Sequence, residues 1–145
     1  DLTEAYAVAD RLVAALEPRL GPVHGYKGGA TSEGGQRMLG LPEPFYGRSF
    51  ARTVLADGAS WPAGGRAYTA EAEIGFVVGR DLPPRHAPYA EHEVRAALAR
   101  AVPLFEINAP AYAKPFEVGG LWLVADNGVT QGLVTGGPGR ALGAA

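Results

Sequence analysis

The spacing of apolar residues along the chain predicts two helices separated by shorter segments. In residues 1–20 the apolar positions recur at helical spacing, Asp1 and Glu4 have the spacing of a capping box, and a Gly-Pro pair ends the pattern. Helical spacing returns over Tyr89–Ala101, and Pro103 is expected to end this second helix. Both helices are long enough to flank a β-rich core.

The other apolar runs are short and are bounded by Gly, Pro, Asn and Asp, which is typical of strands joined by turns. One strand is predicted to start at Val23, and further strands are predicted at 52–55, 70–78 and 104–108. Two more are predicted before and after a turn at 126–128, whereas 44–50 is predicted to be an ordered loop. The order of helix, strands, helix and strands predicts an α+β fold with a mostly β core and flanking helices. A chain of 145 residues is expected to form a single domain, 1–145.

Composition and charge narrow the classes of partner. The net charge is −2 and the basic residues form no block, which argues against a nucleic-acid partner. No apolar run approaches the ~18 residues that would predict a membrane-spanning helix, so we expect no membrane partner. The chain has no cysteine, which excludes thiolate metal sites and is compatible with the cytoplasm, where we expect the protein.

The predicted strand at 70–78 begins with two acidic residues on one face. Glu71 and Glu73 are two positions apart, so their side chains point the same way, and beyond them both faces of the strand are apolar. That pattern predicts a strand covered on both sides. Two like charges there fit either a solvated strand end beside Arg66 or Arg80, or a divalent cation that neutralises both carboxylates.

A third acid repeats this pattern on a later strand. In "PLFEIN" the side chain of Glu106 points away from the apolar face shared by Phe105 and Ile107. Three carboxylates without cysteine would form an oxygen-ligand site, which suits Mg²⁺, Mn²⁺ or Ca²⁺. The sequence therefore raises the hypothesis of one metal site formed by Glu71, Glu73 and Glu106.

Five segments together resemble the 2-keto-4-pentenoate hydratase group of the fumarylacetoacetate hydrolase superfamily. They are "GYKGGATS", "PFYGRSF", "EAEIGFVVGRDLP", "PLFEIN" and "VADNGVTQGLVTGGP", in this order along essentially the whole chain. The resemblance implies that Glu71, Glu73 and Glu106 bind Mg²⁺ or Mn²⁺, and that Lys27 belongs to the catalytic site. It also implies a β-rich fold of that superfamily.

The same resemblance implies a substrate class. Relatives act on 2-oxo acids in the catabolism of aromatic compounds, and a bound cation would stabilise the enolate formed when a proton leaves the neighbouring carbon. We expect a lyase that hydrates a 2-hydroxy-2,4-dienoate, with a 2-oxo acid decarboxylase or a C–C bond hydrolase as alternatives. Arg48 is a candidate to bind the substrate carboxylate, and Asp126 and Asn127 are expected to support the site from behind the ligands.

The chain also departs from the pattern of its relatives. Phe45 stands where some hydratases carry an acid, and the segment after Glu106 lacks an arginine found in many relatives. Family chains continue beyond the position of Ala145, so we expect the N-terminal portion of a hydratase-like fold, incomplete at its C-terminus. Exposed sheet edges would then favour a homo-oligomer or a fragment of a longer chain. A non-catalytic protein that binds small acids is the competing class.

Overall fold

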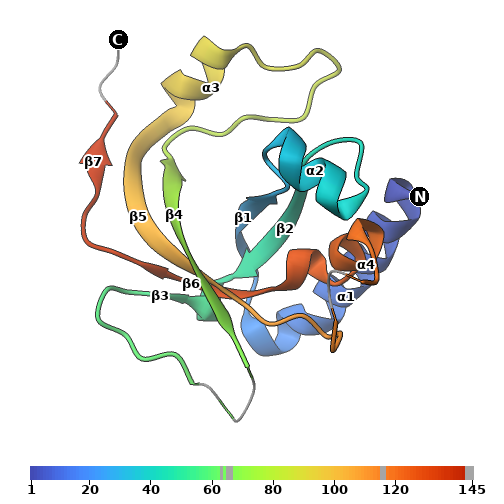
Figure 1. The fold of residues 1–145 in the computed structure, drawn as a ribbon. Helices are drawn as coiled ribbons and strands as arrows, with labels where there is room; N and C mark the ends of the chain where they lie inside the picture. The colour runs from blue at the N-terminus through green and yellow to red at the C-terminus, as the bar shows by residue number, and fades with distance from the viewer. Residues whose placement is uncertain (63, 65–66, 115–116, 143–145) are drawn as a thin grey trace.

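The structure, a computed structural model, describes residues 1–62, 64, 67–114 and 117–142 (Figure 1). Its helices are α1 (Leu2–Leu20), α2 (Glu33–Leu39), α3 (Glu91–Ala97) and α4 (Gly120–Ala125), with short 3₁₀ turns η1 (Ala51–Thr53) and η2 (Asn127–Val129). Its strands are β1 (Val23–Gly29), β2 (Phe45–Phe50), β3 (Val54–Leu55), β4 (Thr69–Val78), β5 (Leu98–Asn108), β6 (Thr130–Thr135) and β7 (Arg140–Ala141).

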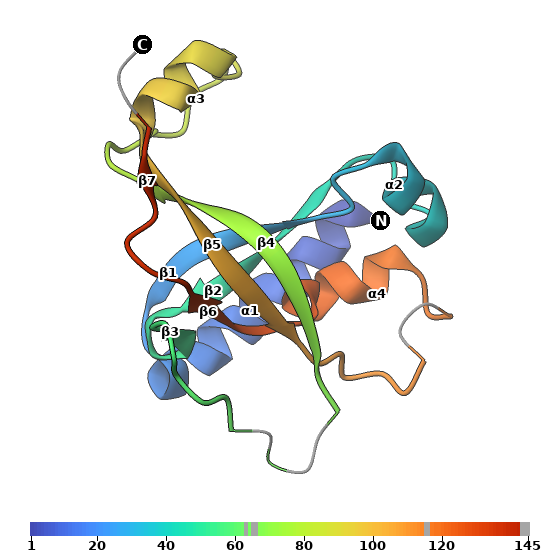
Figure 2. The ribbon, with the colours of Figure 1, turned by 60° about the vertical axis from the view of Figure 1, so that its left-hand side comes forward.

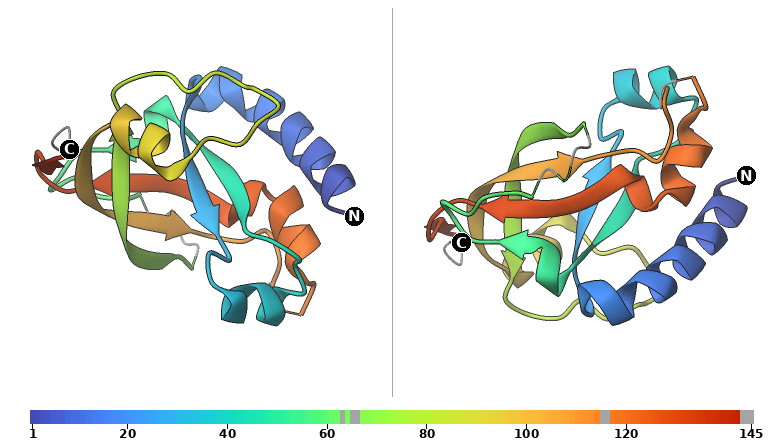
Figure 3. Two further views of the ribbon diagram at one scale, coloured as in Figure 1. Left: turned by 90° about the horizontal axis from the view of Figure 1, so that it is seen from above. Right: turned by 90° about the horizontal axis from the view of Figure 1, so that it is seen from below.

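The described strands form two sheets. Strands β1 and β2 pair in antiparallel fashion, and a second, mixed sheet has the order β3-β6-β5-β4, with β7 also paired to β5. In this sheet β4 and β6 run antiparallel to β5, and β3 runs parallel to β6. Helices α1, α2 and α4 gather around β1 and β2 at one side of the molecule, and β7 lies at the opposite side (Figures 1 and 3). The predicted α+β class is confirmed.

Helix α1 forms as its sequence predicts. The Asp1 side chain accepts a hydrogen bond from the backbone N–H of Glu4 at 2.9 Å, and both halves of the predicted capping box are present. Its buried face packs beside α4, and the two helices lie side by side in Figure 2. The hydrophobic core between them contains the buried side chains of Ala5, Leu41, Phe45 and Val124.

The predicted helix at Tyr89–Ala101 is too long. Helix α3 ends at Ala97, and β5 starts at Leu98 and runs through Pro103 without a break. Pro103 lacks a backbone N–H, but its carbonyl accepts a hydrogen bond from Gly136 at 2.8 Å, so it still ties β5 to the segment that follows β6. Pairing with β4 over almost the whole strand outweighs the local helical spacing.

Two other local predictions are also wrong. Residues 45–50 form strand β2 rather than a loop, because they pair with β1 from Phe45 to Phe50. The segment before the turn at 126–128 is helix α4 rather than a strand, and its Leu123 and Val124 are buried. A short apolar run does not by itself distinguish a buried strand from a buried helical turn.

Strand β4 occurs at the predicted place, but the prediction that it is covered on both sides is wrong for the described structure. The exposed fractions of Ile74, Phe76 and Val78 are 70%, 56% and 57%, and their side chains share one face. On the other face Gly75 lies against Leu104, where an added Cβ would be 2.4 Å from a leucine methyl carbon. The described residues therefore cover only the second face of β4.

Among the described helices, none combines the length and the hydropathy that crossing a bilayer would require.

Candidate metal centre

The pairing of β4 with β5 brings the three predicted glutamates together. Glu71 lies directly opposite Glu106 in the antiparallel register, and Glu73 lies two positions further along the same face of β4. One carboxylate oxygen from each residue lies within 4.8 Å of one from each of the other two. Like charges directly opposite one another destabilise a sheet, so this arrangement needs a compensating positive charge.

Glu106 is the buried member of the group. Its side chain is 1% exposed, whereas Glu71 is exposed and Glu73 is partly buried. Neither oxygen of Glu106 forms a well-aligned hydrogen bond with a described residue. The alternative of a solvated strand end therefore fits Glu71 but not the three glutamates together. Arg66, which that alternative placed beside them, lies outside the described residues.

Among the described residues, Lys27 of β1 is the one that forms an ion pair with this cluster. Its Nζ lies 3.3 Å from Oε1 of Glu106, and its side chain is only 8% exposed. Burial raises the pKa of Glu106 above its ordinary value of 4.5, and the Lys27 ammonium and the Thr130 hydroxyl oppose that increase. The structure thus brings the predicted catalytic lysine into contact with Glu106, one of the predicted metal ligands.

The surroundings of Lys27 hold it in this position. Its ammonium lies 5.1 Å from the centroid of the Phe45 ring, so this aromatic side chain packs against the lysine. A Cβ at position 128 would come within 2.8 Å of Lys27 Cε, and Gly128 has φ +67°. Glycine fits this position because it leaves room for the lysine and tolerates positive φ.

Two polar residues of the site were not predicted from the sequence. Nδ2 of Asn108 donates a hydrogen bond to Oε1 of Glu71 at 3.0 Å, and Thr130 is buried beside Glu106. Asn108 follows Glu106 by two positions, so strand alternation alone would have placed both on one face. Thr130 had no such signal, because its strand was not known to pair with β5 until the structure showed it.

The structure does not bring the Arg48 side chain to the glutamates. Arg48 pairs across the sheet with Tyr26, on the face opposite Lys27, and its guanidinium forms an ion pair with Asp10 of α1. Its backbone is held by Asn127, whose buried side-chain amide bonds both the N–H and the C=O of Arg48 at 2.9 and 2.8 Å. Asn127 therefore joins β2 to the turn that carries Gly128, next to Lys27.

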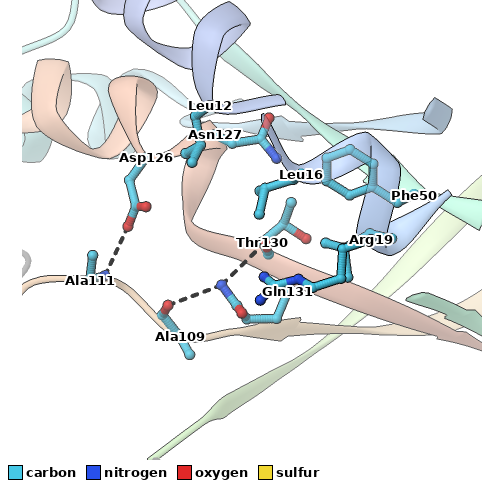
Figure 4. A pocket seen from close by; sticks show the side chains of 11 residues that line it. Leu12, Leu16, Arg19, Phe50, Ala109, Ala111, Asp126, Asn127, Thr130 and Gln131 are labelled. Atoms are coloured by element: carbon cyan, nitrogen blue, oxygen red, sulfur yellow. Dashed lines mark hydrogen bonds between the residues drawn. The ribbon is translucent and has the colours of Figure 1, made fainter. Parts of the chain in front are cut away.

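Asp126 and Asn127 also line a cavity of about 180 Å³ between α1 and the start of β6 (Figure 4). Asp126 accepts a hydrogen bond from the backbone N–H of Ala111 at 2.8 Å, and Gln131 donates to the carbonyl of Ala109 at 3.3 Å. Both bonds fix the segment that follows β5. Asp126 thus supports the backbone near the site, and its predicted role behind the ligands stays a prediction.

The donor set suits a hard divalent cation. All three groups are carboxylates, and the buried oxygens of Glu106 have no well-aligned hydrogen bond to a described residue. Mg²⁺ and Mn²⁺ prefer oxygen ligands, and three carboxylates leave positions free on an octahedral ion for a substrate. The residues present therefore fit the cation that the resemblance implies.

No protein-family model matches the chain. It is similar to two curated proteins of Dechloromonas aromatica (strain RCB) over 138 residues, or 94% of its length. It is 32% identical to 2-keto-4-pentenoate hydratase 1 and 31% identical to 2-keto-4-pentenoate hydratase 2. The matched part is 51% and 52% of those proteins, so the chain spans about half the length of these relatives.

Two solved structures of 4-oxalocrotonate decarboxylase from Pseudomonas putida G7 share the fold, each with a TM-score of 0.82 over 98% of this chain. One is complexed with magnesium and adipate and is 26% identical, and the other is complexed with calcium and acetate and is 27% identical. The match spans 53% and 52% of those chains.

These likenesses first define the class: the chain has a fold of the fumarylacetoacetate hydrolase type, as the sequence predicted. Within that class, its sequence is related to the 2-keto-4-pentenoate hydratases, and the predicted resemblance to this group is confirmed.

Proposed function

We propose that the protein is a divalent-metal-dependent lyase for 2-oxo acids, in which Glu71, Glu73 and Glu106 hold Mg²⁺ or Mn²⁺. The observation that carries this proposal is the convergence of the three carboxylates, with one oxygen of each within 4.8 Å of the others. Glu106 is buried in that group and has a lysine 3.3 Å away. The magnesium bound by the decarboxylase of the same fold supports the choice of cation.

When bound, Mg²⁺ would act as a Lewis acid towards the 2-oxo group of the substrate. The chain's own residues would do the rest. Lys27 holds an ammonium group at the edge of the carboxylate cluster, where it can bind the substrate carboxylate or move a proton. On the face that carries Lys27, the positions of β2 from Phe45 to Ser49 are buried and those of β1 are partly buried, which limits the access of water to the ammonium.

Hydration of a 2-hydroxy-2,4-dienoate is the reaction that we propose first. It is supported by the two relatives named as hydratases, which are similar over almost the whole of this chain. Decarboxylation of a 2-oxo acid is the second candidate, because the structural likeness is to a decarboxylase at a TM-score of 0.82. Cleavage of a C–C bond and binding of a small acid without turnover remain the further alternatives to be tested.

The ultraviolet absorbance of a dienoate allows the first candidate to be tested directly. We expect the purified protein to consume the dienoate with Mg²⁺, to stop when EDTA removes the metal, and to resume when Mg²⁺ is restored. Release of CO₂ from a 2-oxo dicarboxylate would favour the second candidate. Turnover that EDTA leaves unchanged would contradict the metal mechanism, and Mg²⁺ binding without any turnover would favour the acid-binding protein.

A variant at Lys27 separates binding from catalysis. Replacing the ammonium by a methyl thioether in Lys27→Met should lower turnover by about 10²-fold or more, because general acid–base groups contribute at that level. Mg²⁺ binding should persist, since the three carboxylates are intact. Arg95→Met is a matched control, because the ion pair that the described structure gives Arg95 is with exposed Glu91 on α3, away from the glutamate cluster. Full turnover in Lys27→Met would remove Lys27 from the catalytic site.

A further inference from the structure

Asn108 occupies an unusual position at the end of β5. It lies two residues after Glu106, on the same face of the strand, and its side chain is 3% exposed. Its Nδ2 donates a hydrogen bond to Oε1 of Glu71 at 3.0 Å. A buried amide on β5 thus reaches across the sheet to a carboxylate on β4.

Within the described part of the chain, the side-chain oxygen of Asn108 lacks the hydrogen bond that a buried polar atom normally forms. Oδ1 of Asn108 is buried and has no hydrogen-bond partner among the described residues. A buried carbonyl oxygen without a partner costs free energy, and a leucine of similar shape would avoid that cost. The needs of the fold alone therefore do not explain why an amide stands here.

The hydrogen bond to Glu71 offers a better explanation for the amide at position 108. Glu71 is exposed and carries no ion pair to a described residue, so its side chain would otherwise sample many rotamers. The bond from Asn108 fixes one of its oxygens, and lone pairs remain available on the carboxylate for a cation. Glu106 needs no such help, because burial and Lys27 already restrict it.

We propose that Asn108 is a positioning residue that holds Glu71 in the orientation needed to bind the divalent cation. This inference rests on the proposed function, because it assigns a role towards the same cation. Asn108 itself is not a ligand in this account and acts only through Glu71. Residues that orient a metal ligand in this way commonly change metal affinity by about 10- to 100-fold.

Titration calorimetry with Mg²⁺ tests the proposal without any assay of activity. We expect Asn108→Leu to bind Mg²⁺ about 10- to 100-fold more weakly than the wild type, while the metal-free variant melts at a temperature no lower than the wild type. Gln36→Leu is the matched control, because its amide bonds the carbonyl of Ala30 instead of a carboxylate. It should leave the affinity unchanged.

A double-mutant cycle shows whether Asn108 acts through Glu71. In a Glu71→Gln background, measured with Mn²⁺ by electron paramagnetic resonance, Asn108→Leu should cause no further loss of affinity. In a Glu73→Gln background it should still cause its full loss. An equal loss in both backgrounds would overturn the proposal, because Asn108 would then act independently of Glu71.

Failure of the proposed function and failure of the proposed role of Asn108 would give different results. If the wild type binds no divalent cation, the proposed function fails. If the wild type binds Mg²⁺ and folded Asn108→Leu binds it equally well, only the role of Asn108 fails. Should Asn108→Leu lack a cooperative melt, Asn108→Ser provides the same test, because its hydroxyl is too short to replace the amide at Glu71.

Discussion

Glu106 illustrates how a single residue can be unfavourable for the fold and useful for a site. Its carboxyl group is 1% exposed and lies close to two further glutamates, and within the described part of the chain the buried Lys27 is its counter-charge at 3.3 Å. One lysine against three carboxylates leaves the described cluster with an excess of negative charge. A divalent cation would remove that excess, which is why the metal proposal follows from this residue more directly than from the exposed Glu71.

The pH dependence of metal binding should report the state of Glu106. Burial raises the pKa of its carboxyl group, so the folded chain retains the proton to a higher pH than an ordinary glutamate. Because Mg²⁺ binds the deprotonated form, its affinity should still be increasing with pH above 4.5, the ordinary pKa of a glutamate. Calorimetric titrations at several pH values would measure this, and an affinity already constant from that pH would contradict it.

The same shift predicts the sign of a stability change in the metal-free chain. A carboxyl whose pKa is raised on folding contributes stability that is complete below the unfolded pKa and is lost as pH rises through the folded pKa. The contribution of Glu106 should therefore decrease with increasing pH, and added Mg²⁺ should restore stability at neutral pH. Thermal melts of wild type and Glu106→Gln, with and without Mg²⁺, would show whether the pH dependence belongs to this residue.

At the scale of elements, two of the predictions that succeeded show which sequence features were informative. Helix α1 combined helical spacing with a capping box, and β4 combined apolar residues with an acidic pair at its start. The candidate ligands followed because strand alternation fixes the face of each glutamate. The neighbours of β4 were not predictable in this way, since the pairing of Glu71 with Glu106 depends on segments more than thirty residues apart.

Two of the predictions that failed depended on the local pattern of apolar residues alone. The helix at Tyr89–Ala101 has the right apolar spacing, but β5 takes its last residues because they pair with β4 and β7. The apolar run at Leu121–Ala125 forms a helix because Leu123 and Val124 are buried there. In both segments, tertiary contacts decided between two structures that the local sequence allows.

The contact between β2 and the turn η2 should be sensitive to a single methyl group. A Cβ at Gly47 would lie 2.3 Å from the carbonyl oxygen of Asn127, so one of the two backbones must shift. We expect Gly47→Ala to lower the free energy of unfolding by about 1–3 kcal/mol, as other overpacking substitutions do. Denaturant unfolding would measure the loss.

Gly34→Ala provides the matched control within helix α2. The nearest atom to an added Cβ is 3.9 Å away, and alanine has a higher helix propensity than glycine. This variant should be as stable as the wild type or more stable, by up to about 1 kcal/mol. Equal effects of the two substitutions would contradict the close contact between β2 and η2.

At the scale of the whole molecule, one sheet face stands out. Ile74, Phe76, Val78 and Phe105 are exposed by 52–70% and lie on the same face of β4 and β5. In the described structure β4 also ends the path of its sheet, with β5 as its neighbour. An apolar face beside a strand edge favours association with another chain.

We therefore predict that the 145-residue chain associates with copies of itself at micromolar concentration. Light scattering should give a mass above that of one chain, and Phe76→Thr combined with Ile74→Thr should lower it. Val8→Thr is the control, because Val8 is 52% exposed but lies on α1, outside the sheet face. A wild-type chain that is a monomer with a cooperative melt would show that this face needs no cover.

The central claim is that three glutamates bind one divalent cation, and calorimetric titration with Mg²⁺ tests it most directly. We predict that the wild type binds one Mg²⁺ per chain. Glu73→Gln keeps the shape of the side chain but removes its charge, and it should bind Mg²⁺ more weakly by over about 100-fold. A loss of about 100-fold is the upper range for a residue that only orients a metal ligand, so a ligand should exceed it. Glu33→Gln, at an exposed glutamate of α2, should bind like the wild type. Unchanged affinity in Glu73→Gln would contradict the account.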